Sequence, residues 1–548
     1  MDSKVLALDT ETNYTELRKE RYLLGLGVTT DFNTWYIPVG HKPFMGEIVN
    51  NLQVPNDLCQ DFTNPIIAHN VKFDCLEVLP NAGVKVPTGN LWCTMMMSVY
   101  IDENHIPGHD LDAVLATYIG ERKKTMEQKA LKKFGWVTAP PWAMGVYCEQ
   151  DVSPLPKLYE VLRNKSKPIH LEQWEKYDRP FMILLNKIEE RGILVDREKC
   201  LEWENLADLR LREIQEQLEF DPAKPSQLHP KLFDEPPFGL GLTVPSRTPK
   251  TNQPQVSLAW LEGVGHPVTA LVYEYRKLAK QKSSYFSAYL RFTTRDYPRL
   301  HPNFKQNGTE TGRLSCENPN LQQIPREEYA DAHVKKLFLP EEGKELWEID
   351  FRTIEYRLQA VYARSTKLLD LFENEGDFHQ LVADDVSSKL KIPIERFKAK
   401  TINYLMSFGG GVGVLQKQLG VKYSVAEQIH KAYKASYPEI FDKADEAQRI
   451  AEDDMEIDLW SGRTRHFRYP SECRQAFNSV IQGGAFEIVK RSLIRLDEAG
   501  FDIANQVHDS VWIVVDNEKE VEEAQHIMED WTKPIFGLSF RTDRKRLN

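Results

Sequence analysis

The chain of 548 residues is too long for one hydrophobic core, so about three or four domains are expected. Its 41% hydrophobic and 28% charged residues are ordinary for a globular protein, and the lack of any run of about 18 apolar residues excludes a membrane span. The N-terminus lacks a secretory layout, and seven cysteines without a CxxC pair indicate reduced thiols in a cytoplasm. The net charge of −11 excludes little, because local basic segments can still bind phosphates.

The N-terminal part begins with strand-like segments. Residues 4–12 read as a buried strand, and residues 23–29 and 34–39 read as the next two strands of a meander. Residues 65–70 form a further short strand that runs into a helix.

Five side chains with metal or water chemistry accompany these segments. Asp9 and Glu11 close the first strand, and Asp74 lies in the first turn of the helix. Tyr147 and Asp151, four residues apart, share one helical face. Each residue alone is more often a helix cap or a solvated side chain, so only the combination is informative.

In order and context these motifs resemble the DEDD-type 3′–5′ exonuclease domain, in the subtype with a tyrosine, over residues 1–165. The resemblance implies an RNase H-like α/β fold in which the four carboxylates hold two divalent metals and Tyr147 orients the attacking water. Because all four carboxylates are present, an intact exonuclease is favoured over a decayed domain kept for packing.

The middle of the chain is helical apart from one proline-rich segment. Residues 177–196 have helical apolar spacing that stops at Gly192, and residues 198–218 and 268–286 continue as helices. Residues 221–256 contain eight prolines and are expected to form an extended loop or linker.

A basic stretch covers residues 273–305. It contains eight basic and two acidic residues. A solvated helix face would explain this charge equally well, but long helices that carry lysines also fit a clamp over the backbone of duplex DNA.

Two aspartates far apart in the sequence define a candidate catalytic site. Asp350 would sit at the tip of a buried strand, with Glu355 and Arg357 in the turn and helix that follow. Asp509 precedes a β-branched run with strand character. Two strands that each deliver one aspartate predict a two-metal site for phosphoryl transfer, whereas two unrelated loop aspartates are the alternative.

Two helical stripes accompany these aspartates. The first recurs every four residues and comprises Arg396, Lys400, Tyr404 and Phe408. The second comprises Arg474, Asn478 and Gln482. The cationic N-terminal end of the first stripe favours phosphates, and core packing would bury unpaired cations at a high cost. The second stripe, taken alone, is typical of a solvated helix face.

The segments TGRLS at residues 311–315 and NPNLQQIP at residues 318–325 match, nearly residue for residue, a segment of family A DNA polymerases. The resemblance covers about residues 175–548, and the sequences that contain Asp350 and Asp509 are similar to the first and third catalytic motifs of the family. It implies a right hand of palm, fingers and thumb in which the two aspartates bind two Mg²⁺ ions, which Mn²⁺ can replace.

The same resemblance implies roles for the surrounding residues. Lys400 would neutralise the triphosphate and donate a proton to pyrophosphate, and Glu355 would exclude ribonucleotides beneath the sugar. Arg313 and Gln482 would check minor-groove acceptors of the new base pair. The other residues implied to bind substrate are Arg396, Tyr404, Phe408, His379, Asn478, Arg474 and His508.

Two positions depart from the family pattern. Ser510 replaces the usual Glu after His-Asp, which removes one carboxylate near the metals but leaves both principal ligands. Phe408 replaces a common Tyr, so Glu355 lacks a hydroxyl partner, and looser rejection of ribonucleotides is expected. Tyr404 stands where tyrosine accompanies acceptance of dideoxynucleotides in the family, and such acceptance is expected here.

The predicted organisation is an exonuclease domain over residues 1–165 followed by a polymerase domain. The thumb is expected at residues 170–300, the palm at 301–375 and 470–548, and the fingers at 376–469. The predicted activity is replicative, template-directed DNA synthesis with proofreading. The alternatives are a nuclease whose polymerase-like half only binds DNA, and a catalytically inactive single-strand-binding protein.

The expected partners are primer–template DNA and deoxynucleoside triphosphates, bound by a monomer. Nothing precedes the exonuclease segment and no insertion for a processivity factor is evident, so no 5′ nuclease is expected. This compactness resembles phage replicative members, which would place the chain in the cytoplasm of a bacterial host. The sequence identifies no helicase or primase partner.

Overall fold

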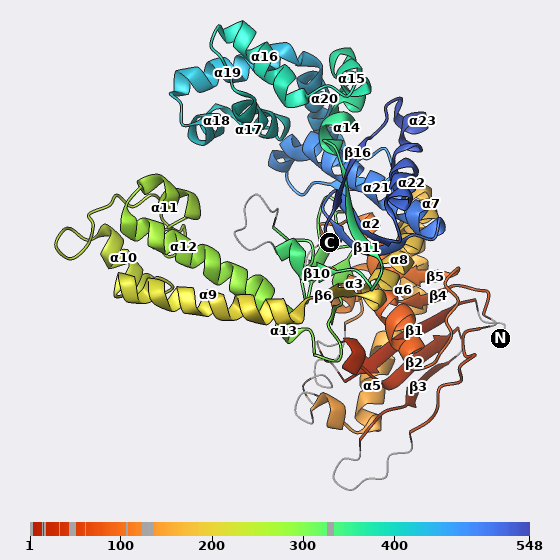
Figure 1. Cartoon of the computed structure of the whole chain (residues 1–548). Coiled ribbons are helices and arrows are strands. Elements are labelled where there is room, and N and C mark those ends of the chain that lie inside the picture. The colour runs from red at the N-terminus through yellow and green to blue at the C-terminus, as the bar shows by residue number, and fades with distance from the viewer. Residues whose placement is uncertain are drawn as a thin grey trace. The chain divides into compact units, whose positions relative to one another are not determined.

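The computed structural model describes residues 4–13, 15, 18–31, 33–42, 51–60, 62–105, 108–122, 129, 131, 135–325 and 334–548. The chain divides into two compact units, and Figure 1 shows its helices and strands. Unit 1 comprises residues 1–191, 303–317 and 344–546. Unit 2 comprises residues 192–302, 318–343 and 547–548. Among the described residues, no helix combines the length and apolar character needed to cross a membrane.

Unit 1 begins with a five-stranded sheet in the order β3-β2-β1-β4-β5. The strands are β1 (Leu6–Thr12), β2 (Leu23–Thr30), β3 (Thr34–Pro38), β4 (Ile66–Ala68) and β5 (Leu91–Cys93). β1 pairs antiparallel with β2 and parallel with β4, which gives a mixed sheet. The four strands expected here are confirmed within about two residues, and β5 was not foreseen.

Helices pack against this sheet. α5 (Pro141–Val152) contacts β1, β2 and β3, whereas α6 (Leu155–Lys165) packs with α2 (Thr94–Ile101) and β4. η2 (Lys72–Val78), a wide-turned π-helix, follows β4 and has Asp74 in its first turn. Buried residues of β1, β4, β5, η2, α2 and α6 share one core. Two buried residues of α5, Ala143 and Met144, pack instead in a smaller cluster with Leu24 of β2.

A second sheet of unit 1 carries the two aspartates. Its order is β14-β15-β11-β16, with antiparallel pairing throughout. The strands are β11 (Glu345–Phe351), β14 (Asp502–Val507), β15 (Ser510–Val515) and β16 (Thr542–Arg546). His508 and Asp509 form the tight turn between β14 and β15, where His508 adopts a left-handed φ of 53°. α21 (Ala476–Glu498) is buried along most of its length and packs with β14.

A helical region of unit 1 follows β11. α14 (Ile354–Ala363) packs against α21 and α20 (Pro438–Asp454). α16 (Phe378–Leu390) packs with α17 (Arg396–Ser407) and α19 (Tyr423–Ser436), and α17 also meets α18 (Val412–Leu419). α17 carries most of the first predicted stripe.

Unit 2 begins later than the expected start of the thumb at residue 170. α8 (Arg179–Arg191) belongs to unit 1, since it packs against α21 and η2. Gly192 opens unit 2, where β6 (Ile193–Val195) pairs with β7 (Arg299–Leu300) and β10 (Phe338–Leu339). Residues 318–343, expected to be palm, also belong to unit 2.

Two expectations for unit 2 need correction. α9 (Arg197–Leu218) and α12 (Pro267–Gln281) lie side by side (Figure 1), but residues 221–256 are not a continuous loop. They contain α10 (Pro225–Phe233), which buries Leu228 and Leu232 in the same core. Pro225 stands in the first turn of α10, where proline is tolerated because the N–H of that position has no helical partner.

The basic stretch at residues 273–305 also has fewer unpaired cations available for DNA phosphates than its charge suggested. Lys282 Nζ lies 2.6 Å from Asp208 Oδ1, and Arg299 Nη2 lies 2.7 Å from Glu341 Oε1. Arg276 donates to the carbonyl of Val256. Arg295 and Lys305 also form ion pairs, with Glu198 and Glu317. At least five of the eight cations therefore already have protein partners.

Candidate active sites

Asp350 and Asp509 meet at one end of the second sheet. Asp350 is paired with Ser510 across β11 and β15, directly beside the turn that holds Asp509. The backbone N–H of Phe351 donates to the carbonyl of Asp509 at 3.3 Å. Both aspartate side chains are half-buried, so they are accessible from solvent. Two neighbouring carboxylates of this kind offer the oxygen donors that hard divalent cations prefer.

Arg313 and Glu355 lie beside this pair. Arg313 Nη2 donates to Glu355 Oε1 and lies 4.0 Å from Asp509 Oδ1. Burial raises the pKa of Glu355, the Arg313 charge opposes that shift and the Asp509 charge adds to it. Glu355 is therefore held by the guanidinium of Arg313. The sequence had indicated only that Glu355 lacks a tyrosine hydroxyl, because residue 408 is Phe, and this partner was not foreseen.

Helix α21 approaches the segment that carries Arg313. A Cβ atom added at Gly483 would lie only 2.8 Å from the carbonyl of Thr311, so glycine permits this contact. Gln482 and Asn478 lie on α21 and are half-buried. Arg474 lies in a separate 3₁₀ turn (Pro470–Gln475), so one helix does not carry the whole second stripe. The Glu472 carboxylate accepts from the backbone N–H groups of Arg468 and Tyr469 at the start of that turn.

Strand β11 also carries a carboxylate that the sequence analysis missed. Glu348 Oε1 lies 3.1 Å from Ser510 Oγ and 3.2 Å from Trp512 Nε1. Residues two apart on a strand face the same side, so Glu348 shares a sheet face with Asp350. That two-residue spacing is visible in the sequence and could have identified it.

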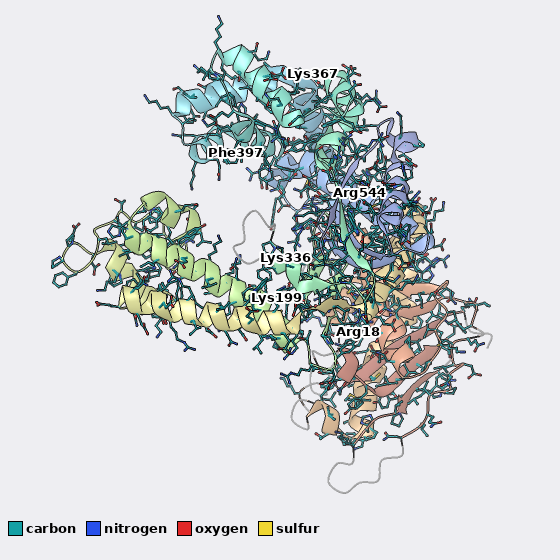
Figure 2. All side chains as sticks on the ribbon, in the orientation of Figure 1. Arg18, Lys199, Lys336, Lys367, Phe397 and Arg544 are labelled. Carbon is teal, nitrogen blue, oxygen red and sulfur yellow. The ribbon has the colours of Figure 1, made fainter. Side chains whose placement is uncertain are left out.

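Helix α17 exposes much of its predicted stripe. Lys400 is exposed and Tyr404 is 61% exposed, which argues against core packing for both. Phe408, which directly follows the helix, meets Tyr404 edge-on with ring centroids 4.9 Å apart. Arg396 Nε donates to Asp377 Oδ2 at 2.6 Å, so this cation is paired. Phe397 also projects from α17 (Figure 2).

His379 connects α17 with α14. Its Nδ1 lies 2.7 Å from Asn403 Nδ2, and its ring meets Tyr356 edge-on with centroids 5.8 Å apart. Tyr356 directly follows Glu355. Burial lowers the pKa of His379, and the nearby Lys400 charge lowers it further. The lowered pKa favours a neutral imidazole, which lies near Lys400 of α17 and against Tyr356 of α14.

The N-terminal sheet holds a second carboxylate cluster. Asp9 and Glu11 on β1 and Cys148 on α5 have ligand atoms that all lie within 4.8 Å of one another. The thiol of Cys148 donates to Asp9 Oδ2 at 3.4 Å. The sequence analysis missed Cys148, although it directly follows Tyr147.

Asp74, Tyr147 and Asp151 complete this cluster. Asp74 Oδ1 accepts from the Thr10 hydroxyl at 2.6 Å and from the Thr10 backbone N–H at 3.1 Å. Burial nevertheless raises the pKa of Asp74 to about 7. Burial and the charges of Asp151, Glu11 and Asp9 raise the pKa of Tyr147, which keeps its hydroxyl protonated as a donor. All five predicted residues thus share one site.

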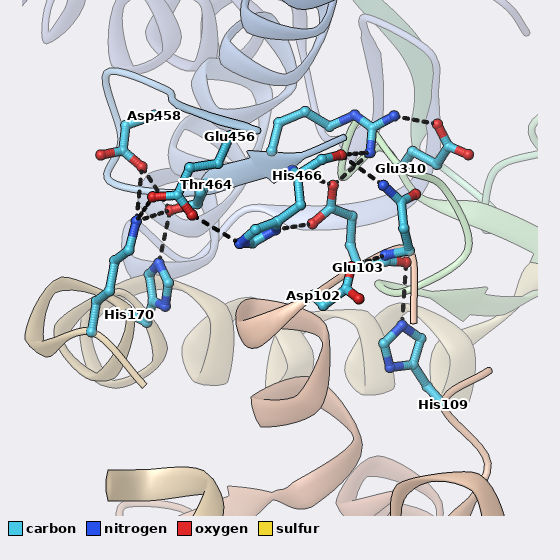
Figure 3. A network of polar contacts seen from close by, with 12 residues as sticks. Asp102, Glu103, His109, His170, Glu310, Glu456, Asp458, Thr464 and His466 are labelled. Atoms are coloured by element: carbon cyan, nitrogen blue, oxygen red, sulfur yellow. Dashed lines mark hydrogen bonds and ion pairs between the residues drawn. The ribbon is translucent and has the colours of Figure 1, made fainter. Parts of the chain in front are cut away.

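A polar junction joins the N-terminal region to a hairpin of β12 (Glu456–Asp458) and β13 (Thr464–His466), as Figure 3 shows. Glu103 accepts from Arg465 Nη1 and His466 Nδ1, both at 2.6 Å. Arg465 Nη2 donates to Glu310 Oε2 at 2.6 Å, three residues before Arg313. Although burial acts in the opposite direction, the His466 and Arg465 hydrogen bonds lower the pKa of Glu103.

Asp102, Glu103 and His466 have the spacing of metal ligands, but this cluster is explained as a structural junction. Both oxygens of Glu103 already accept hydrogen bonds from the hairpin. The hairpin contacts the N-terminal region a second time, where His170 Nε2 lies 3.0 Å from Thr464 Oγ1 (Figure 3).

Profile comparisons decide the family. The profile described as DNA polymerase family A matches residues 201–537, and that described as 3'-5' exonuclease matches residues 1–167. The chain belongs to DNA polymerase family A. The two matched regions contain the two carboxylate sites.

Curated relatives of this family A chain are named DNA polymerase I. The protein from Pseudomonas aeruginosa is 26% identical over 94% of this chain and 60% of its own length. The protein from Borreliella burgdorferi is 27% identical over 96% of this chain and 60% of its own length. The thermostable protein from Thermus aquaticus is 31% identical over 54% of this chain and 37% of its own length. This chain therefore spans about 60% of the length of the first two relatives.

A solved structure shares the fold of this family A chain. It is the POL domain of Pol1 from M. smegmatis, in a complex with DNA primer-template and dNTP. The TM-score is 0.82 at 20% sequence identity, and the match covers 100% of this chain and 95% of that one.

Proposed function

We propose that this family A chain extends a primer on a DNA template and proofreads the product with a 3′–5′ exonuclease. The observation that carries the proposal is the meeting of Asp350 and Asp509 at one sheet end within the family A match. The match of the N-terminal region to an exonuclease profile supports the second activity. The substrates on this proposal are primer–template DNA and deoxynucleoside triphosphates.

Both sites fit divalent metal ions because their donors are carboxylate oxygens, with Mg²⁺ the proposed ion and Mn²⁺ a substitute. Asp350 and Asp509 would hold the ions of the polymerase site. Those of the exonuclease site would be held by Asp9, Glu11, Asp74 and Asp151. When bound, such ions lower the pKa of an attacking hydroxyl or water and balance charge on the transferred phosphate.

Residues of α17 and its neighbours would position the nucleotide. Lys400, which is exposed, would balance triphosphate charge and supply a proton to the leaving pyrophosphate. Arg396, oriented by Asp377, and the neutral His379 would add phosphate contacts. Tyr404 would place its exposed ring against the base and sugar, with the Phe408 ring packed beside it.

The groups around Arg313 would test the new base pair and its sugar. Arg313 and Gln482 can donate to the minor-groove acceptors that all correct pairs present, so they test geometry rather than sequence. Glu355, held by Arg313, would block the 2′ position of the sugar. Asn478, Arg474 and His508 would contact the primer–template.

In the exonuclease site, Tyr147 would donate a hydrogen bond to the attacking water or to a phosphate oxygen. Burial, together with the charges of Asp151, Glu11 and Asp9, raises the pKa of this hydroxyl and keeps it protonated across neutral pH. Thr10 would hold Asp74 in place through its two hydrogen bonds. These residues therefore orient the groups around the reacting phosphate.

Primer extension and single-strand degradation with purified variants test both activities. Asp350→Ala should abolish extension and leave degradation, whereas the double change Asp9→Ala with Glu11→Ala should do the reverse. A loss of both activities in either variant would point to misfolding and requires a matching thermal melt. Extension that survives Asp350→Ala would overturn the polymerase proposal, and wild-type degradation without extension would favour a nuclease with a DNA-binding half.

A further inference from the structure

We propose that Glu348 is a third acidic residue of the polymerase metal site and raises the affinity of Asp350 and Asp509 for divalent cations. The inference rests on the proposed polymerase function. Glu348 lies on β11, the strand that pairs with β15 directly after the turn that holds Asp509. Glu348 acts as a positioning residue, through the charge that it adds beside the two aspartates.

The placement of Glu348 follows from the strand pairing. Glu348 lies opposite Trp512 and Asp350 lies opposite Ser510, so all four residues share one sheet face. The Glu348 carboxylate reaches Ser510 Oγ at 3.1 Å and Trp512 Nε1 at 3.2 Å. Residues 348 and 350 are about 7 Å apart along β11. Because the Glu348 carboxylate reaches Ser510, which lies opposite Asp350, it extends along the strand toward Asp350.

Two neutral side chains of β15 donate to this carboxylate, and Lys545 lies opposite Glu348 on the other neighbouring strand, β16. The Ser510 hydroxyl and the Trp512 indole are neutral donors, and both residues are buried. The single proton of the hydroxyl can go to Glu348 or to the Val507 carbonyl, which lies 2.9 Å away. Ser510 thereby links Glu348 to the turn that carries Asp509.

The position of Glu348 also offers an explanation for Ser510, which stands where the family usually has Glu. Ser510 provides no carboxylate after Asp509, and the neighbouring strand provides one within hydrogen-bond distance of that serine. A charge supplied from β11 would act on the same cations as a charge supplied from β15. A purely structural role, as an acceptor for Ser510 and Trp512, is the competing explanation.

Glu348→Gln separates the two explanations, because glutamine retains an acceptor oxygen of the same shape but removes the charge. Glu345→Gln is the matched control. It removes the same charge from the same strand, but from the opposite face and about 17 Å from Asp350 along the strand. Glu345 pairs with the exposed Arg546 and accepts a hydrogen bond from Trp347 Nε1. Glutamine keeps an acceptor for the indole, so the change should have little effect on stability.

The measurement is Mn²⁺ binding followed by electron paramagnetic resonance. It uses the full chain with Asp9→Ala and Glu11→Ala, which weaken binding at the exonuclease site. Glu348→Gln should weaken Mn²⁺ binding about tenfold, and the Mg²⁺ concentration for half-maximal primer extension should rise by a similar factor. Glu345→Gln should change neither value.

Further variants distinguish failure of this inference from failure of the proposed function. Asp350→Ala should abolish the Mn²⁺ binding in question, and binding that survives this change would overturn the polymerase metal site itself. If Asp350→Ala loses Mn²⁺ binding while Glu348→Gln and Glu345→Gln bind Mn²⁺ with equal affinity, only the role of Glu348 would be overturned.

A restored charge provides the reciprocal test. Adding Ser510→Glu to Glu348→Gln should recover most of the lost Mn²⁺ affinity, because the carboxylate returns to the same sheet face. No recovery in a double variant that melts at the same temperature as Glu348→Gln would contradict a charge-based role.

Discussion

The two carboxylate sites of unit 1 differ in how their charge is balanced. In the N-terminal site, Asp74 is buried and its pKa is raised to about 7 despite two hydrogen bonds from Thr10. In the other site, Asp350 and Asp509 are half-buried at a strand end, and Arg313 lies 4.0 Å from Asp509. The N-terminal site therefore contains a carboxyl group with a pKa near neutrality, whereas the other site has a guanidinium beside its carboxylates.

The largest effect is expected from removing a positive charge beside the polymerase site, that of Lys400. Lys400→Met should lower the kcat/KM of nucleotide incorporation about 100-fold or more, since a preorganised charge at the triphosphate is lost. The exonuclease rate should not change. Single-turnover extension and degradation on the same preparation measure both values.

Lys398→Met is the control for this change, because Lys398 lies on the same helix and is similarly exposed. It should reduce incorporation by less than about twofold. Equal losses in the two variants would mean that Lys400 contributes only general positive charge.

The raised pKa of Asp74 predicts that the exonuclease and polymerase activities depend differently on pH. With Mg²⁺ below saturation, the exonuclease rate should fall about tenfold per pH unit below pH 7, because Asp74 must lose its proton to bind metal. Polymerase activity should lack this dependence on Asp74. Parallel profiles for the two activities, measured from pH 5.5 to 8, would contradict the difference in charge balance.

The same pKa shift predicts a change in stability without metal. The pKa of Asp74 rises from 3.8 to about 7 on folding, so between these values the folded state holds a proton that the unfolded state releases. The contribution of this residue to stability should therefore fall as the pH rises from about 4 to 7. Asp74→Asn should remove that fall, and chelator-treated protein in thermal melts tests it.

Site residues that follow from the pattern of a single segment could be predicted from the sequence. Contacts between side chains from distant segments could not. The strands that carry Asp9 and Asp350, and the strand that follows Asp509, were visible as apolar runs next to carboxylates. The Arg313–Glu355 pair and the approach of Cys148 to Asp9 depend on tertiary contacts that no local pattern contains.

The helix within residues 221–256 was missed for a different reason. The density of prolines suggested a loop, but Pro225 lies at the helix start and Leu228 and Leu232 supply a buried face. Apolar spacing was thus more informative than composition. The thumb, palm and fingers remain predictions, because a division into two compact units does not test the limits of these three parts.

The partner of Glu355 predicts a smaller effect on sugar selection. Phe408→Tyr should raise discrimination against ribonucleotides several-fold, since a hydroxyl would add a second partner to the one supplied by Arg313. Steady-state incorporation of ribo- and deoxynucleotides gives the ratio. Phe397→Tyr, on an exposed part of α17, should leave the ratio unchanged, and identical ratios in all three proteins would refute the effect.

The junction of Figure 3 should have the smallest effect on the two chemical rates. Glu103→Gln should destabilise unit 1 by about 1–3 kcal/mol, because it weakens buried hydrogen bonds from Arg465 and His466. Both activities should stay within about twofold of the wild type at permissive temperature. Thermal melts and the two activity assays measure these outcomes.

Glu121→Gln is the control for the junction, since Glu121 forms an exposed pair with Lys157 and should contribute less than about 1 kcal/mol. Because the pKa of Glu103 is lowered on folding from 4.5, its stabilisation is present above that value and is lost as the pH falls through the folded pKa. The melting temperatures of wild type and Glu103→Gln should therefore converge in acid. A constant difference at all pH values would contradict an ionic contribution.

The most direct test of the central claim is a crystal structure of the exonuclease-deficient chain with a dideoxy-terminated primer–template, the next complementary nucleotide and Mn²⁺. Anomalous diffraction should locate metal ions shared by the carboxylates of Asp350 and Asp509, with Lys400 in contact with the triphosphate. A nucleotide bound elsewhere, or metal that contacts neither aspartate, would contradict the proposed polymerase site.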